Sequence, residues 1–305
     1  MTAAAARPRP TKLGAWKLAV RIPTLPAAMA PVLVGTGVAI LRDEFALLPA
    51  LAALLGALLL QVGANFANDV FDYRRGADTK DRLGPPRATQ MGFLSQREVF
   101  TGMWIAFAAA FLIGIYLVYV GGWPIVAVGL SSIAAAIIYT GGPWPIGYHA
   151  LGDLFTFVFF GLAAVVGTYY VQAGDAPLIA WLAAIPLGCT VTMILVINNL
   201  RDIPTDSRTG KKTLGVVMGD AGTRRWYLFL LVVAYVSAIA TWAAGASAFV
   251  LLVLGSLWWA KGPVSAIRRG TAGGALNPIL RATARFHLVF GLLFAIGLAL
   301  GRLLD

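Results

Sequence analysis

Four side chains that could bind a cation follow one another at helical spacing near the end of a long apolar run. They are Asn65, Asn68, Asp69 and Asp72, at positions i, i+3, i+4 and i+7, which share one face of a helix. Two carboxylates on one face repel each other unless a cation lies between them. Carboxylate and carboxamide oxygens suit Mg²⁺, which proteins hold through one or two carboxylates while phosphate oxygens fill other positions. We therefore predict a magnesium site here.

A second cluster of the same kind occurs much later in the chain. Asn198 and Asp202 lie one helical turn apart, and Asp206 follows at the same spacing. Pro204 either ends the helix, which would put Asp206 on a loop, or lies within it. Two acidic clusters that face each other would bind a diphosphate through two bridging Mg²⁺ ions, with basic side chains neutralising the remaining charge. The alternative is that both clusters are solvated helix ends.

Basic residues follow each acidic cluster and are candidates for binding the diphosphate. They are Lys80, Arg82 and Arg87 after the first cluster, and Arg208, Lys211 and Lys212 after the second. Taken singly, each is better explained as a solvated charge that marks one side of a membrane. As a group beside two acidic clusters, they also indicate a surface that attracts anions.

These clusters must be positioned by a very apolar chain. Of its 305 residues, 59% are hydrophobic and only 12% are charged, with a mean hydropathy of +0.79, whereas about a quarter of the residues in a soluble domain are charged. Apolar runs of ~20 residues, the length of a membrane-spanning helix, recur along the sequence. They cover 16–41, 47–67, 99–120, 123–140, 152–172, 178–199, 224–244, 246–260 and 285–303. The predicted fold class is all-α, a polytopic transmembrane bundle of about nine helices.

The net charge of +11 is arranged by membrane topology. Of the 24 lysines and arginines, 22 fall in four segments that share one side of the membrane if nine spans follow a cytoplasmic N-terminus. Basic segments stay in the cytoplasm, so the charge does not indicate a nucleic-acid partner. We predict a single transmembrane domain over 1–305, with a polar tail at 1–15 and cytoplasmic loops at about 72–97 and 202–224.

Other kinds of site are disfavoured by the sequence. The single cysteine, Cys189, cannot form an intrachain disulfide, and His149 and His287 lie far apart without cysteine partners, which disfavours zinc. A secondary transporter carries its acids within its spans, whereas the acids here gather at span ends on one side. A transporter is therefore the weaker interpretation.

Several stretches resemble the UbiA superfamily of intramembrane aromatic prenyltransferases. "NDVFD" and "DIPTD" are similar to its paired aspartate motifs. Longer stretches resemble its menaquinone-pathway branch, the 1,4-dihydroxy-2-naphthoate prenyltransferases, in the expected order over most of the chain. These stretches are "RIPTLPAAMAPVLVGTG", "NDVFDYRRGADTKDRLGPPRATQMG", "YTGGPWPIGYHALGDLFTFVFFGLAAVVGTYYVQ", "VINNLRDIPTDSRTGKKTLGVVMG" and "LNPILRATARFHLVFGLL".

The chain departs from the superfamily pattern in two places. The commoner form has a third aspartate a few residues after the second, where this chain has Gly76 and Ala77. Either Asp78 or Asp81 would then complete the first metal site. The Tyr–Lys–Arg pattern of other branches is here "YTGGPWPIGY", which keeps Tyr139 without the basic residues.

The resemblance implies an enzyme that binds a polyprenyl diphosphate through Mg²⁺ and basic side chains. The electron-rich ring of 1,4-dihydroxy-2-naphthoate would attack the prenyl group with loss of CO₂, giving a demethylmenaquinone-type product in menaquinone biosynthesis. The implied location is the lipid bilayer of a prokaryotic cell membrane. Another aromatic acceptor, such as 4-hydroxybenzoate or homogentisate, is the alternative within the superfamily. The implied catalytic carboxylates are Asp69, Asp72, Asp202, Asp206 and Asp153.

Four further residues have both a structural and a functional interpretation. Asp153, at the start of the fifth apolar run, is either a helix N-cap or an acid near the aromatic ring. Tyr139 and Tyr148 either line the aromatic pocket, where their π faces would stabilise a cation, or anchor the chain at the membrane interface. Arg21 either reaches the diphosphate or the aromatic carboxylate, or is one more cytoplasmic charge.

Overall fold

The described part of the chain folds almost entirely into helices in a computed structural model, which covers residues 10–77 and 82–304. In chain order they are α1 (Lys12–Val20), η1 (Ile22–Thr24), α2 (Pro26–Leu41), α3 (Leu47–Arg74), α4 (Gln96–Gly121), α5 (Trp123–Ile138), η2 (Ile146–Tyr148), α6 (Gly152–Thr156), η3 (Phe157–Ala163), α7 (Ala164–Ala173), α8 (Leu178–Arg208), α9 (Leu214–Ala243), η4 (Ala248–Ser256), α10 (Leu257–Arg268), η5 (Gly273–Ala275) and α11 (Leu276–Leu304). The prediction of an all-α bundle is confirmed.

Seven helical segments in the described ranges are long and apolar enough to cross a membrane. An eighth crossing results if α1 and η1 (Lys12–Thr24) form one span with α2 (Pro26–Leu41), from which they are bent by 47°. The remaining predicted run is α5, whose 16 residues reach only ~24 Å, less than the ~30 Å of a hydrocarbon core. The chain is thus a multi-pass membrane protein by helix length and composition, and the count of nine spans stays a prediction.

The first apolar run, 16–41, is bent in the structure rather than forming one straight helix. Arg21 adopts a left-handed conformation with φ 54° and ends α1, and the prolines that follow lack the N–H groups that would continue the helix. The side-chain amide of Asn65 on α3 donates to the Val20 carbonyl and to the Thr24 hydroxyl, both at 2.9 Å. A polar residue of another helix therefore supports the bend.

The loops predicted at 72–97 and 202–224 are shorter in the structure, because the helices on both sides extend into them. The first loop lies between the end of α3 at Arg74 and the start of α4 at Gln96, and the second between the end of α8 at Arg208 and the start of α9 at Leu214. Pro204 removes one backbone N–H from α8, but the helix continues through it. The aspartates of both clusters therefore lie on helices.

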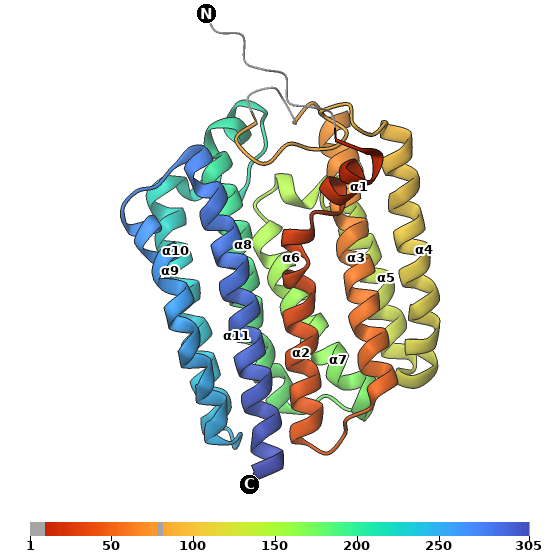
Figure 1. Ribbon diagram of the computed structural model, residues 1–305, viewed down its shortest axis with the longest axis vertical. Helices are drawn as coiled ribbons and strands as arrows, with labels where there is room; N and C mark the ends of the chain where they lie inside the picture. Colours follow the sequence, from red (N-terminus) through yellow and green to blue (C-terminus); the bar gives the residue numbers. More distant parts are fainter. Residues whose placement is uncertain (1–9, 78–81, 305) are drawn as a thin grey trace, which may run out of the picture.

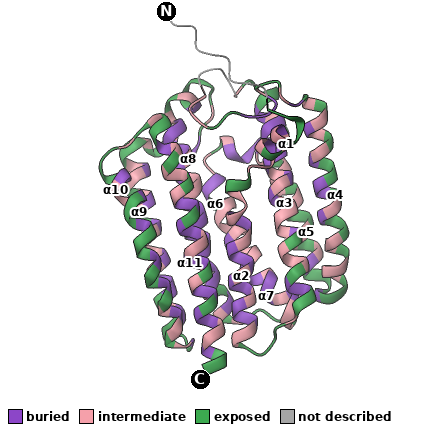
Figure 2. Cartoon of the chain, in the orientation of Figure 1, coloured by how far each residue is buried: buried purple, intermediate pink, exposed green. Residues whose placement is uncertain are grey.

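The helices run side by side along the long axis of the molecule, with α1 at one end of the bundle and the last turn of α11 at the other (Figure 1). α8 is the central helix, since 67% of the residues in its apolar part are buried, against 22% in α4. Exposed residues follow the outer helix α4 along its length (Figure 2). α8 packs against α9, α2 against α11, and α3 against α4. The C-terminal ends of α3 and α8, which carry the acidic clusters, lie at the end of the bundle where the chain begins (Figure 1).

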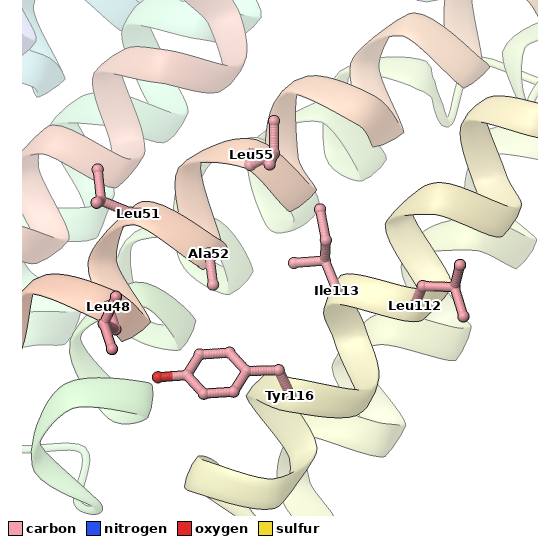
Figure 3. Close-up of a pocket in the computed structure, with 7 residues that line it drawn as sticks. All are labelled: Leu48, Leu51, Ala52, Leu55, Leu112, Ile113 and Tyr116. Atoms are coloured by element: carbon pink, nitrogen blue, oxygen red, sulfur yellow. The ribbon is translucent and has the colours of Figure 1, made fainter.

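An apolar groove of ≈ 520 Å³ lies between α3 and α4 (Figure 3). Its lining residues are Leu48, Leu51, Ala52, Leu55, Leu112, Ile113 and Tyr116. The α3 residues of this lining belong to the first part of that helix, at the other end from Asp69 and Asp72. Because the lining is hydrocarbon apart from one tyrosine, the polar chemistry of the protein lies elsewhere.

Candidate functional site

The first acidic cluster lies at the end of α3, where both carboxylates are buried. Asp69 is 1% exposed and Asp72 is 3% exposed. The two carboxylate oxygens of Asp72 accept hydrogen bonds from Arg87 Nη2 at 2.8 Å and from the Tyr148 hydroxyl at 3.0 Å. The loop after α3 and the loop after α5 therefore meet on Asp72.

The two asparagines of this cluster connect α3 to neighbouring segments. Asn65 donates hydrogen bonds to Val20 and Thr24 at the bend between α1 and α2. Asn68 Oδ1 accepts a hydrogen bond from the Thr140 hydroxyl at 3.0 Å, and the Asn68 carbonyl accepts one from Arg87 Nη1 at 2.5 Å. The predicted polar stripe thus exists on one helix, and its carboxamides bond to other parts of the protein. Their role as metal ligands stays a prediction.

Asp69 differs from its neighbours in how its carboxylate is bonded. Its Oδ1 atom is buried and has no hydrogen-bond partner among the described residues. A buried acceptor without a partner costs on the order of 1–3 kcal/mol, and more if it is charged. Native proteins keep few such atoms, and a missing ion is one explanation for them. The orphaned oxygen therefore fits a ligand for a cation.

In the second cluster, a buried arginine of the same helix binds Asp202. Arg201 is 1% exposed and donates from Nε and Nη2 to the two carboxylate oxygens of Asp202, at 2.8 and 2.6 Å. It also donates to Asn198 Oδ1 at 2.7 Å and to Asn277 Oδ1 at 2.9 Å. Asn277 in turn donates to the Leu83 carbonyl at 2.9 Å. Arg201 therefore joins α8 to α11 and, through Asn277, to the loop after α3.

Lys211 lies near carboxylates of both clusters. Its Nζ atom is 4.0 Å from Asp206 Oδ1, and it also interacts electrostatically with Asp72. Asp206 and Asp72 are close enough to interact with each other. The Lys211 ammonium lies 5.2 Å from the centre of the Tyr148 ring, while the Lys212 N–H donates to the Tyr148 carbonyl at 3.1 Å. The two clusters, far apart in sequence, thus share one basic side chain.

Asp153 lies near the start of α6 and is buried. Its two carboxylate oxygens accept hydrogen bonds from Trp226 Nε1 at 3.1 Å and from Asn199 Nδ2 at 3.5 Å. The N-cap position of α6 is occupied by Leu151. The N-cap interpretation of Asp153 is therefore wrong, because side chains of α8 and α9 hold its carboxylate.

Tyr139 follows α5 and lies against the start of α6. A Cβ atom at Gly152 would be only 2.7 Å from the Tyr139 hydroxyl oxygen. A phenol hydroxyl is normally protonated near pH 7, since its ordinary pKa is about 10. The Tyr139 hydroxyl can therefore donate a hydrogen bond.

The remaining predicted residues have more varied surroundings. Arg82 donates to the Pro85 carbonyl at 3.1 Å and interacts electrostatically with Asp72. Arg21 lies at the bend after α1, and Arg208 is exposed at the end of α8. The residues outside the described ranges are Asp78, Lys80 and Asp81.

The sequence interpretation missed several residues of this network, among them Arg201, Asn277 and Trp226. Arg201 counted there only as a cytoplasmic charge. Its position directly before Asp202, on a helix that continues an apolar run, was a usable signal, because a charge that becomes buried needs a partner. No comparable signal marks Trp226, which is one of nine tryptophans.

Within residues 10–77 and 82–304, no three His, Cys, Asp or Glu side chains gather as a ready metal cluster. Each acidic cluster offers two carboxylates, one of which pairs with an arginine: Asp72 with Arg87, and Asp202 with Arg201. Mg²⁺ is usually bound by one or two carboxylates, with phosphate oxygens and water as further ligands. The donor set therefore fits Mg²⁺ that is held jointly with a diphosphate.

The fold and the site define a class, namely multi-pass helical membrane proteins with two acidic clusters at one end of the bundle. The sequence matches the UbiA prenyltransferase family over residues 28–272, and the chain belongs to this family. A 1,4-dihydroxy-2-naphthoate octaprenyltransferase of Mycobacterium tuberculosis (strain ATCC 25618 / H37Rv) is 42% identical, over 94% of this chain and 98% of that protein. The resemblance to the naphthoate branch is thereby confirmed.

Two solved structures share the fold. A UbiA homolog from Aeropyrum pernix K1, in an apo structure, is 17% identical with a TM-score of 0.70, over 88% of this chain and 97% of that chain. A UbiA homolog from Archaeoglobus fulgidus, bound to DMAPP and Mg²⁺, is 12% identical with a TM-score of 0.61, over 92% of this chain and 99% of that chain. At these identities the similarity establishes the fold.

Proposed function

We propose that this protein transfers a polyprenyl group from a polyprenyl diphosphate to 1,4-dihydroxy-2-naphthoate, with loss of CO₂. The product is the reduced form of a demethylmenaquinone. The observation that carries the proposal is that carboxylates of both acidic clusters lie around Lys211. The identity to the naphthoate octaprenyltransferase over nearly the whole chain supports the choice of acceptor.

We assign Mg²⁺ binding to the two acidic clusters, with two ions that bridge the diphosphate. The orphaned oxygen of Asp69 supports this assignment, and so does the presence of DMAPP and Mg²⁺ in the Archaeoglobus fulgidus homolog. Bound Mg²⁺ neutralises the charge that develops on the leaving diphosphate. The assigned residues are Asp69, Asp72, Asp202 and Asp206, with Asn65, Asn68, Asn198 and Asp78 as further oxygen ligands.

We assign diphosphate binding to the basic residues around the clusters. Arg87 and Lys211 support this assignment most directly, because both lie beside cluster carboxylates. An arginine can present two parallel N–H donors to phosphate oxygens, and a lysine contributes a compact charge. The other assigned residues are Lys80, Arg82, Arg208, Lys212 and Arg21.

The proposed reaction balances without an oxidant. The C–O bond of the prenyl diphosphate breaks, and the diphosphate leaves with the bonding electrons. The ring carbon that carries the carboxylate forms the new C–C bond with a pair of ring electrons. The bond from that carbon to the carboxylate then breaks, and its electrons restore the aromatic ring as CO₂ departs. The apolar bundle around the site keeps water away from the reactive prenyl group.

We infer that the naphthoate binds near Tyr139 and Asp153. Tyr139 can donate a hydrogen bond to an acceptor oxygen, because a phenol hydroxyl is protonated near pH 7. Asp153 is oriented by Trp226 and Asn199 and can accept a phenolic proton of the ring. Tyr148, which donates to Asp72, would lie at the boundary between the diphosphate and the ring.

We further propose that the acidic end of the bundle faces the cytoplasm of a prokaryotic cell and that residues 1–305 form one domain. The four basic segments support this orientation, since positively charged segments remain in the cytoplasm. The first described helix, α1, and the last turn of α11 lie at opposite ends of the bundle (Figure 1), which fits an odd number of crossings.

The decisive experiment is an acceptor assay with the purified protein in detergent. A polyprenyl diphosphate and Mg²⁺ are supplied with 1,4-dihydroxy-2-naphthoate, 4-hydroxybenzoate or homogentisate, and product and CO₂ are measured. We expect prenylation of the naphthoate alone, and none when Mg²⁺ is removed by a chelator. Prenylation of a different acid would show that this acid, and not the naphthoate, is the acceptor. Ion flux in proteoliposomes without any prenylation would favour a transporter.

A further inference from the structure

Arg201 is a fully buried arginine whose guanidinium is held by several hydrogen bonds. It forms four of them, two to Asp202, one to Asn198 and one to Asn277. A guanidinium has five N–H donors, and burying its charge is costly unless nearly all of them find partners. The surroundings of Arg201 are therefore built to hold this one side chain in one orientation.

The chain after α3 lies directly on this guanidinium. A Cβ atom at Gly84 would be 2.8 Å from Arg201 Nη2, so the backbone can pass here because residue 84 has no side chain. The carbonyl of the preceding residue, Leu83, accepts the hydrogen bond from Asn277. Two independent contacts thus fix the Leu83–Gly84 segment against α8 and α11.

This segment also carries two of the basic residues of the first cluster. Arg82 directly precedes it, and Arg87 follows it a few residues later. Both interact with Asp72 on α3. The contacts of Arg201 and Asn277 therefore determine where the first cluster's arginines lie relative to the second cluster.

We propose that Arg201 and Asn277 are positioning residues that set the spacing between the two acidic clusters. We call Arg201, Asn277 and the Leu83 carbonyl the interhelical clamp. The clamp orients Asp202 and holds the loop of Arg82 and Arg87 over the second cluster, so that one diphosphate reaches both. The existence of the clamp follows from these contacts alone, whereas its effect on kinetics rests on the proposed function.

Two substitutions of Asn277 separate the halves of the clamp. Asn277→Asp keeps an oxygen acceptor for Arg201 but removes the donor to the Leu83 carbonyl, whereas Asn277→Ala removes both contacts. We expect both variants to exchange backbone hydrogens faster than wild type in segment 82–95, measured without ligand. We expect the KM for the prenyl diphosphate to rise about tenfold in both variants, the effect of about one hydrogen bond to a buried group, with kcat within about threefold.

An arginine elsewhere provides a matched control. Arg224 also makes four hydrogen bonds, two to Asp220 and two to the backbone carbonyls of Ile267 and Thr271. Arg201→Lys and Arg224→Lys each keep the charge and lose the planar fork. We expect Arg201→Lys to raise both the KM for the prenyl diphosphate and the Mg²⁺ concentration for half-maximal rate, while Arg224→Lys changes neither.

The outcomes distinguish the clamp from the proposed function. Wild-type exchange rates in segment 82–95 of Asn277→Asp would overturn the clamp, and so would equal kinetic changes in the Arg201 and Arg224 variants. If the wild-type protein prenylates no aromatic acid, the proposed function fails. The exchange measurement, together with binding of geranyl diphosphate and Mg²⁺ followed by thermal shift, then still decides whether the clamp exists.

Discussion

The two acidic clusters contain the same kinds of residue but hold them in different ways. On α3, Asp72 is paired with Arg87, which lies 15 residues further along the chain on a loop. On α8, Asp202 is paired with Arg201, the residue before it on the same helix. The first pair joins a loop to α3, whereas in the second pair Arg201 is also held by hydrogen bonds to Asn198 and Asn277.

This difference indicates a division of labour between the clusters. In each cluster one aspartate forms an ion pair with an arginine. Among the described residues, the other aspartate does not: Asp69 Oδ1 has no hydrogen-bond partner, and Asp206 lies 4.0 Å from Lys211. We interpret Arg87 as a side chain that can exchange Asp72 for the phosphate oxygens of a substrate. We infer that Arg201 instead stays on Asp202, because four hydrogen bonds hold its guanidinium in place.

The largest expected effect follows from removing the orphaned carboxylate. Asp69→Asn should lower kcat by at least about a hundredfold, as losses of charge stabilisation at a reaction centre commonly do. The fold should survive, because Asp69 Oδ1 holds no protein group. The measurements are the prenyl transfer rate and the melting temperature in detergent. An active Asp69→Asn enzyme would contradict the metal site on α3.

The next largest expected effect is a difference in unfolding free energy between variants of the two arginine–aspartate pairs. Asp202→Asn should cost about 3 kcal/mol of stability, because it leaves the charge of Arg201 buried without a carboxylate. Asp72→Asn should cost about 1 kcal/mol, since Arg87 lies on a loop and can turn toward water. Denaturant or thermal unfolding of the two variants tests this order. Equal losses would mean that the two pairs do not differ as described.

A smaller effect is expected at the lysine between the clusters. Lys211→Ala should raise the KM for the prenyl diphosphate about tenfold, because it removes the charge that both clusters share. Arg225→Ala is the control, because Arg225 is exposed on α9 and a lone surface charge contributes little, so its KM should change less than about twofold. Similar values for both variants would show that only the overall positive charge at this end of the bundle matters.

The smallest effect concerns the acceptor side of the site. Trp226→Phe removes the N–H that donates to Asp153 but keeps an aromatic ring stacked on Phe229. We expect the KM for the naphthoate to rise about fivefold, the value of about one hydrogen bond, with the KM for the prenyl diphosphate unchanged. A change in the diphosphate KM alone would place Asp153 with the acidic clusters instead.

The sequence was sufficient to predict the features that depend on local periodicity. The apolar runs predicted helices, and the spacing of Asn65 to Asp72 predicted one polar face, because helical periodicity depends only on near neighbours. The bend at Arg21 was not predicted, and the continuation of α8 through Pro204 was one of two alternatives that the sequence left open. The bend is supported by a group from elsewhere in the fold, Asn65 on α3. The contacts of Arg201 with α11 are equally invisible in sequence, since they join residues 76 positions apart.

The bend after α1 also bears on how the chain enters the membrane. The Val20 carbonyl and the Thr24 hydroxyl at this bend receive their hydrogen bonds from Asn65, which lies 45 and 41 residues later. An unsatisfied backbone carbonyl is costly in a lipid environment. Because Asn65 belongs to α3, its hydrogen bonds to this bend form only when α3 packs beside α1 and α2. We therefore expect α1, α2 and α3 to reach their final packing in the membrane together, as one unit.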